Sequence, residues 1–230
     1  MKLTFLGTGA ADWSRPAPNG ERRRLCSTRI GESLLIDGTR QILDILTDPE
    51  AITHIVYTHE HGDHFDRGLW ESLPHARHLA PFAGEGLESV EPLIPFEAGG
   101  MKLTAVRGNH SVPVCHYLVE DGEKALYYAL DSAWLTYGEY AFLRGKTLDG
   151  MVIDATIGDG HEGDYRVFEH NSLAMVRIMV DSLRATGILR ENAPVFVSHL
   201  AFTLHPSSDE LRASLTPGYI APMDSETYEI

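Results

Sequence analysis

Four metal-ligand side chains fall within six positions of the segment YTHEHGDHFD (57–66), namely His59, His61, Asp63 and His64. The residues before them, ITHIVYT (52–58), are β-branched and aromatic, which is typical of a buried strand. Two histidines spaced by two can point the same way from an extended turn and bind one metal ion, while Asp63 and His64 can serve a second ion. A solvated polar turn is the plain alternative, but the pattern is rare by chance at this composition. The segment therefore predicts a metal centre at the end of a strand.

Four donors from one loop cannot complete two coordination spheres, so this hypothesis requires further donors elsewhere. Three residues of the right type each follow another β run: His110 in VRGNHSVP, Asp131 in YYALDSAW and His199 in VFVSHLAF. Each alone could be a cap, a turn residue or a core histidine. Together with the histidine-rich segment they predict seven donors that converge at one edge of a sheet. Imidazole and carboxylate donors without a thiolate suit Zn²⁺ or Mn²⁺, and Fe²⁺ also fits.

The remaining pattern indicates a single α/β domain over residues 1–230, without an internal repeat or a linker. We expect strands at 2–8, 52–58, 101–108, 114–120, 124–130, 149–155 and 193–200, and a hairpin over 25–38. Helices are expected at 40–47, 170–186 and 207–215. In the helix at 170–186, Asn171 or Ser172 can form the N-cap, and Leu173, Val176 and Val180 fall on its apolar face.

Composition excludes several classes of protein. The formal charge is −14, with 19 Lys and Arg against 33 Asp and Glu, which argues against a long nucleic acid as partner. No run of eighteen apolar residues exists, so neither a membrane span nor a membrane partner is expected. Cys26 and Cys115 form no CxxC pair, and the first residues make a poor signal peptide and a good first strand. We therefore expect a cytoplasmic protein without disulfides.

The motif THEHGDH, with the downstream His110, Asp131 and His199, resembles the metallo-β-lactamase superfamily of dinuclear hydrolases. Several stretches are similar to its phosphoribosyl cyclic phosphate phosphodiesterase (PhnP-type) branch: LGTGAAD, GNHSVP, ALDSAW, VIDAT, EHNSL, VSHLAFTLH and MDSETYEI. The resemblance covers nearly the whole chain and implies a four-layer αββα sandwich with the metal centre at one edge, between two β-sheets. PhnP-type proteins often carry a cysteine-rich structural zinc site near the N-terminus. Because Cys26 stands alone here, we predict no such site.

The resemblance also implies how the donors are shared. One ion would bind His59, His61 and His110, the other would bind Asp63, His64 and His199, and Asp131 would bridge them. Two ions that share a water molecule lower its pKa toward neutrality and so generate a hydroxide nucleophile.

Other residues are candidates for supporting roles. Asp63, His170 and His205 are the candidate catalytic residues, the two histidines as proton donors to a leaving alkoxide or as phosphate ligands. A helix cap at His170 and an exposed loop position at His205 are equally simple explanations. Asp154, at the end of a strand, could orient a ligating histidine. Trp134 could wall the pocket beside Asp131, and the resemblance implies that Asp224 packs near the site.

These features predict a metal-dependent hydrolase, first of all a phosphodiesterase acting on a small or cyclic phosphate ester. A thioester or lactone hydrolase of the glyoxalase II or lactonase type would use the same site. A non-catalytic metal-binding sensor module is the alternative from another class. A tRNA 3′-processing nuclease would need a basic surface or an RNA-gripping arm, and the sequence shows neither. A flavin-coupled di-iron oxygen reductase is disfavoured, because it has a glutamate where His61 stands. The superfamily resemblance allows a homodimer, but no interface is readable in the sequence.

Overall fold

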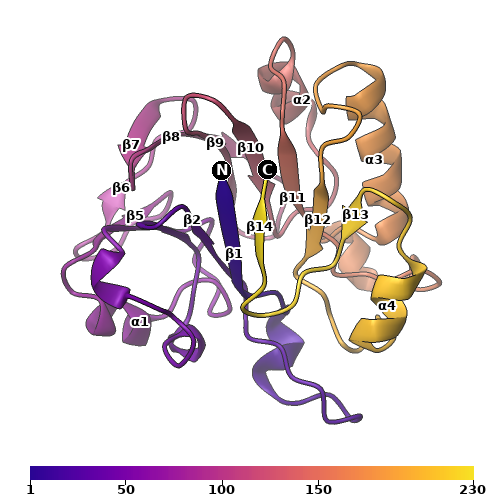
Figure 1. The fold of residues 1–230 in the computed structure, drawn as a ribbon, viewed down its shortest axis with the longest axis horizontal. Coiled ribbons are helices and arrows are strands. Elements are labelled where there is room, and N and C mark those ends of the chain that lie inside the picture. The colour runs from indigo at the N-terminus through magenta and orange to yellow at the C-terminus, as the bar shows by residue number, and fades with distance from the viewer.

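The computed structural model describes residues 1–230, and its strands form two seven-stranded sheets that pack face to face (Figure 1). The first sheet has the strand order β14 (Thr227–Glu229), β1 (Lys2–Gly7), β2 (Ser27–Ile30), β3 (Leu34–Ile36), β4 (His54–Val56), β5 (Arg77–Ala80) and β6 (Glu88–Ser89). The second has the order β13 (Tyr219–Ile220), β12 (Val195–Ser198), β11 (Gly150–Asp154), β10 (Ala125–Ala129), β9 (Cys115–Glu120), β8 (Met101–Arg107) and β7 (Pro95–Ala98).

Helices cover the outer faces of both sheets. Helix α1 (Arg67–Ser72) lies outside the first sheet, and α2 (Tyr137–Leu143), α3 (Leu173–Ala185) and α4 (Ser208–Ser214) lie outside the second (Figure 1). Four short 3-10 segments connect these elements: η1 (Ala11–Ser14), η2 (Arg40–Ile42), η3 (Pro49–Ala51) and η4 (Tyr165–Phe168). The expected four-layer αββα sandwich is confirmed. None of the helices has the length and apolarity that a membrane crossing requires.

The layers follow from the period-two alternation of the central strands. On β11, Met151 and Ile153 pack toward α3, while Val152 faces the other sheet. Phe196 of β12 and Phe5 of β1 meet between the sheets, with ring centroids 5.2 Å apart. Both faces of β11 and β12 are therefore buried, which explains why these two strands read as continuous apolar runs rather than as an alternating pattern.

Helix α3 confirms the predicted amphipathic helix and shifts its start. Ser172 is the N-cap, and its hydroxyl accepts a hydrogen bond from the Met175 backbone N–H. The predicted apolar face is buried against the second sheet. The chain leaves the helix at Gly187, whose φ of +72° suits glycine.

Another predicted helix, at 40–47, is wrong. Only the 3-10 segment η2 forms there, over Arg40–Ile42. Asp48 lies at φ 48°, immediately before Pro49, and the residue before a proline disfavours the α conformation. Helices α1 and α2 and strands β5, β6, β7, β13 and β14 were not predicted, because their sequences show no clear hydrophobic period.

Helix α2 is tied to the strand end that carries Asp131 by a buried polar network. Glu139 accepts hydrogen bonds from the Tyr127 hydroxyl at 2.8 Å and contacts His116 Nδ1 at 2.5 Å. The other ring nitrogen of His116 lies 3.1 Å from the Leu130 carbonyl. The His116 ring is therefore held between two acceptors, the Glu139 carboxylate and the Leu130 carbonyl. This network fixes the backbone just before Asp131.

Parallel strands bring the chemically reactive residues together. Strands β3 to β6 are parallel to one another, and so are β10 to β13. In such sheets the carboxyl ends of the strands lie at one edge, which is the usual place for a site. His59, Asp131 and His199 all follow the carboxyl ends of such strands.

Candidate metal centre

The predicted donors converge at one edge of the sandwich because the chain turns sharply at the strand ends. Asp131 and His199 have φ values of 55° and 58°, in the left-handed region that non-glycine residues seldom adopt. Such a conformation costs roughly 1 kcal/mol or more and persists where the surrounding structure enforces it. Here it points each side chain across the end of its own strand toward the loop that follows β4.

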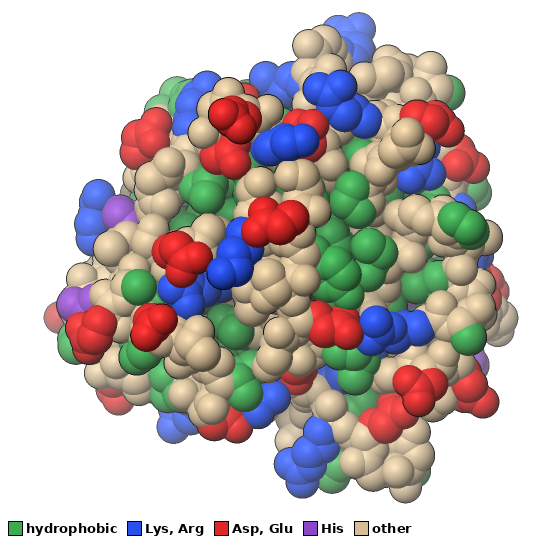
Figure 2. All heavy atoms as spheres, viewed as in Figure 1, with side chains coloured by type: hydrophobic (Ala, Val, Ile, Leu, Met, Phe, Trp, Pro, Cys, Tyr) green, Lys and Arg blue, Asp and Glu red, His purple; other side chains and the backbone are tan.

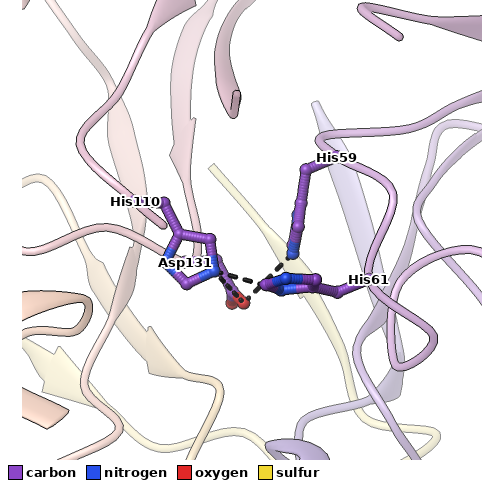
Figure 3. Close-up of side chains that lie close together, drawn as sticks. All are labelled: His59, His61, His110 and Asp131. Carbon is purple, nitrogen blue, oxygen red and sulfur yellow. Dashed lines mark hydrogen bonds and ion pairs between the residues drawn. The ribbon is translucent and has the colours of Figure 1, made fainter. Parts of the chain in front are cut away.

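His59, His61, His110 and Asp131 form the first group of donors (Figure 3). Their ligand atoms all lie within 4.8 Å of one another. His110 Nε2 is 3.2 Å from His61 Nδ1, and His59 Nε2 is 3.4 Å from Asp131 Oδ2. The three imidazoles face a common point from two different loops, as the dashed lines in Figure 3 show.

Asp63, His64, Asp131 and His199 form the second group. Asp131 Oδ1 is 3.1 Å from His64 Nε2 and 3.0 Å from His199 Nε2. Asp63 Oδ2 lies 3.2 Å from His199 Nε2. Asp131 therefore presents Oδ2 to the first group and Oδ1 to the second, which is the arrangement that a carboxylate bridging two ions requires.

Three of these atoms are buried and have no hydrogen-bond partner: His59 Nε2, His64 Nε2 and Asp131 Oδ1. A buried polar atom without a partner costs about 1–3 kcal/mol, so such atoms are rare in folded proteins. Here they face one another across a gap instead of forming well-oriented hydrogen bonds. Divalent ions between them would satisfy all three, and the donor set fits zinc, manganese or iron.

The other ring nitrogens are held by the protein, which fixes the direction in which each ring points. His64 Nδ1 lies 2.8 Å from Asp37 Oδ2, and His199 Nδ1 lies 2.7 Å from the Thr156 hydroxyl. His59 Nδ1 lies 3.0 Å from the Thr58 hydroxyl. A histidine held at Nδ1 presents the lone pair of Nε2, and such supporting contacts are typical of metal sites. His61 is the exception, because its Nδ1 faces the centre.

The charges in the cluster are strongly coupled. Burial and the neighbouring His64 lower the pKa of His59 to about 2. Burial alone would lower the pKa of His199, but Asp131 and Asp63 raise it to about 10. Burial would likewise raise the pKa of Asp131, yet His199 and His64 hold it well below its usual range. Positive charge is thus required beside the two carboxylates, and bound divalent ions would take the place of these protons.

A cavity of about 260 Å³ gives access to both groups, with His61, Asp63, His110, Asp131 and His199 in its wall. His170 lines the same cavity, and its ring stacks on that of His199 with centroids 5.1 Å apart. His170 Nδ1 lies 2.8 Å from Asp154 Oδ2. The structure therefore brings His170 and Asp154 to the predicted centre.

Three other predicted site residues lie elsewhere. His205 donates from Nε2 to the Ala155 carbonyl at 2.8 Å and lines a neighbouring cavity. The backbone N–H of Trp134 donates to Asn171, and its side chain is 43% exposed and lies outside the cavity wall. The Asp224 carboxylate accepts a hydrogen bond from the Arg24 backbone N–H at 2.6 Å, beside a different pocket. Their positions depend on how loops fold back, which spacing along the chain does not reveal.

Comparisons with known proteins identify the architecture. No protein-family model matches the chain, and no curated protein matches it. A diphosphatase from the PhnP family is 22% identical, with 99% of this chain and 96% of that chain covered and a TM-score of 0.68. YhfI from Bacillus subtilis, a metallo-β-lactamase fold protein, is 14% identical, with coverage of 99% and 98% and a TM-score of 0.70. Zn²⁺-bound PqqB from Methylobacterium extorquens is 14% identical, with complete coverage of both chains and a TM-score of 0.70. The chain has the metallo-β-lactamase fold.

Within this metallo-β-lactamase fold, Asp37 and Cys26 are among the residues near the centre that were not predicted from the sequence. Asp37 is fully buried after β3, at φ 57°, and it holds both His64 and the Thr58 backbone N–H. Its position after the apolar run SLLID is the same signal that identified Asp131 and could have revealed it. The Cys26 sulfur lies within 4.8 Å of the His64 and His199 ligand nitrogens. A lone cysteine far from the motif in sequence carries no comparable signal.

Replacing Asp37 with asparagine should weaken metal binding by about 10- to 100-fold, the usual effect of losing a group that orients a ligand. Asparagine preserves the shape but loses the carboxylate charge that holds the Nδ1 proton of His64. Competition with a chromophoric chelator measures the affinity. Asp159→Asn is the matched control, because that carboxylate pairs with Arg177 on the surface. Equal metal affinity in Asp37→Asn and wild type would contradict the role of Asp37.

Proposed function

We propose that this protein is a dinuclear-metal hydrolase that cleaves a small phosphate diester. In this proposal His59, His61 and His110 hold one divalent ion, and Asp63, His64 and His199 hold the other. Asp131 lies between them, and its presentation of one oxygen to each group is the observation on which the proposal rests. Zinc or manganese suits these donors, and iron also fits.

When bound, two divalent ions would lower the pKa of a water molecule and offset negative charge on the phosphoryl oxygens. The protein's own residues supply the remaining functions. Asp37 and Thr156 hold the rings of His64 and His199 in place. His170 would donate a proton to the leaving oxygen of the ester. Burial opposes protonation of His170, but Asp154 outweighs it and raises the pKa, so His170 keeps its proton to higher pH than an ordinary histidine.

The wall of the cavity offers an anionic substrate one guanidinium group, near the carboxylates of Asp12 and Glu169. Arg166 is the only lysine or arginine in that wall. Its Nε and Nη2 donate to Asp164 at 2.8 and 3.1 Å, and Nη1 donates to the Thr203 hydroxyl at 3.1 Å. The guanidinium is therefore fixed in place, and two of its N–H groups remain for a phosphoryl oxygen. The similarity to a diphosphatase from the PhnP family points in the same direction.

The proposal is tested by activity and metal content together. The zinc- or manganese-loaded protein should hydrolyse bis(p-nitrophenyl) phosphate and contain close to two metal ions per chain by mass spectrometry. A panel of lactones and thioesters should be turned over far more slowly. Turnover of thioesters or lactones without phosphodiesterase activity would overturn the assignment of the bond, and a metal content near zero would overturn the assignment of an enzyme.

The role of His170 predicts a dependence on the leaving group. In His170→Ala, hydrolysis of a diester with a poor alkyl leaving group should fall by about 10²-fold, at the low end of general acid catalysis. Hydrolysis of bis(p-nitrophenyl) phosphate should change little, because nitrophenolate leaves without a proton. Measuring kcat for both substrates separates the two roles. An equal loss on both substrates would contradict proton donation and indicate that His170 only holds the site together.

A further inference from the structure

Four arginines line one pocket beside the loop 13–24. The pocket has a volume of about 300 Å³, and its basic residues are Arg15, Arg22, Arg23 and Arg24. Only two carboxylates line it, those of Asp44 and Asp224. The excess of guanidinium groups stands out in a chain whose formal charge is −14. This loop projects at the lower end of the molecule in Figure 1, and Figure 2 shows basic side chains on that projection.

Arg23 forms the buried base of this pocket. Its side chain is 5% exposed, and no carboxylate lies within ion-pair distance of its guanidinium. Its Nη1 instead donates to the Thr8 hydroxyl at 2.6 Å and the Pro222 carbonyl at 2.8 Å, and its Nη2 donates to the Ser208 hydroxyl at 3.0 Å and the Met223 sulfur at 3.1 Å. All of these acceptors are neutral. Burial lowers the pKa of Arg23, and the charges of Asp224 and Glu21 offset this only in part. An anion in the adjoining pocket would compensate this charge.

The other three arginines differ in whether carboxylates of the protein already pair with them. Arg24 is shared between Asp44, at 2.7 Å from Nη2, and Asp224, at 3.4 Å from Nη1. Arg15 and Arg22 are exposed and form neither a hydrogen bond nor an ion pair through their side chains. Arg15 only lies over the Phe202 ring, 5.7 Å from its centroid. Two guanidinium groups are therefore available at the mouth of a pocket with a buried third at its base.

We propose that this arginine pocket, lined by Arg15, Arg22, Arg23 and Arg24, is a binding site for a phosphate dianion. Guanidinium groups bind phosphate through paired, charge-assisted hydrogen bonds, and several of them around one cavity favour two negative charges over one. The site is distinct from the metal centre, because the two cavities share no lining residue. The turn Ala11–Ser14 separates them, with Ala11 and Asp12 in the wall of the metal cavity and Trp13 in that of the arginine pocket.

The test is calorimetric titration of the full-length, metal-loaded protein with inorganic phosphate, at low ionic strength. Arg15→Ala/Arg22→Ala should weaken one binding event by about 10-fold or more, as expected when charge-assisted hydrogen bonds are lost. Arg107→Ala/Arg144→Ala is the matched control, since those arginines are exposed, lack ion pairs and lie outside the pocket. Any phosphate bound at the metal centre is common to all variants, so the comparison isolates the arginine pocket.

The variant Asp44→Asn is expected to strengthen phosphate binding rather than weaken it. Asp44 is 68% exposed, so the substitution leaves the core intact. It frees Nη2 of Arg24, whereas Nε stays bonded to the Gln41 carbonyl at 2.9 Å. Phosphate should then bind more tightly than in wild type by several-fold. The titration is then repeated with ribose 5-phosphate. A site for the free ion should bind this ester no more tightly than inorganic phosphate, whereas a site for a phosphorylated molecule should bind it more tightly.

Three results would overturn this proposal: no phosphate binding outside the metal centre, equal weakening in both double variants, or no tightening in Asp44→Asn. None of them depends on hydrolysis. The arginine pocket can therefore fail while the proposed enzyme stands, and it can stand if the enzyme assignment fails.

Discussion

Replacing Asp131 with asparagine is expected to reduce phosphodiester hydrolysis by about 10³-fold and to lower the metal content from two ions toward one. Asp131 is the residue whose two oxygens face both groups of histidines, at 3.4 Å from His59 Nε2 and 3.1 Å from His64 Nε2. An amide keeps the shape but offers one oxygen instead of two and carries no charge. Initial rates and metal content by mass spectrometry, measured on the same preparation, check the expectation.

The control for this variant is Asp159→Asn, an equal change on the surface that should leave both rate and metal content intact. Circular dichroism should show that Asp131→Asn folds, because the network of Glu139 and His116 that fixes the preceding backbone is untouched. A folded Asp131→Asn protein that retains two ions and the wild-type rate would exclude a bridging role for Asp131.

Removal of the metal ions is expected to destabilise the fold itself. An ion that binds only the native state contributes about 4 kcal/mol when its free concentration is a thousand times its Kd. For a chain of this length, 1 kcal/mol shifts the Tm by about 2–4 °C, so chelation should lower the Tm by about 10 °C or more. The physical reason is that the buried atoms His59 Nε2, His64 Nε2 and Asp131 Oδ1 form no hydrogen bond, so they have no partner once the metal ions are removed.

Differential scanning calorimetry with and without a chelator, followed by readdition of zinc or manganese, measures this effect. The Asp131→Asn variant serves as the internal control, because it should show a smaller shift than wild type. A Tm that is unchanged by chelation, in a protein shown to have lost its metal, would mean that the cluster is stable as a network of ion pairs.

The architecture was largely predictable from the chain because it rests on local patterns. Strands such as β11 and β12 are apolar runs, and the spacing of apolar residues in α3 predicts which face of that helix is buried. The four-layer order came from the resemblance of the motifs rather than from periodicity. The short helices α1 and α2 were missed because their stability comes from tertiary contacts, as with the buried Glu139 of α2. The helix expected at 40–47 failed because Asp48 and Pro49 impose a turn.

The sequence by itself determined which residues could bind metal. Residue type and position near the end of a β run identified seven donors, and the structure brings them together at one edge of the sandwich. Tertiary structure alone decided the supporting contacts. It placed Asp37 behind His64 and Asp154 beside His170, and it turned His205 and Asp224 toward other pockets. The physical reason is that a strand end fixes where a side chain starts, whereas its partners come from loops whose paths depend on long-range packing.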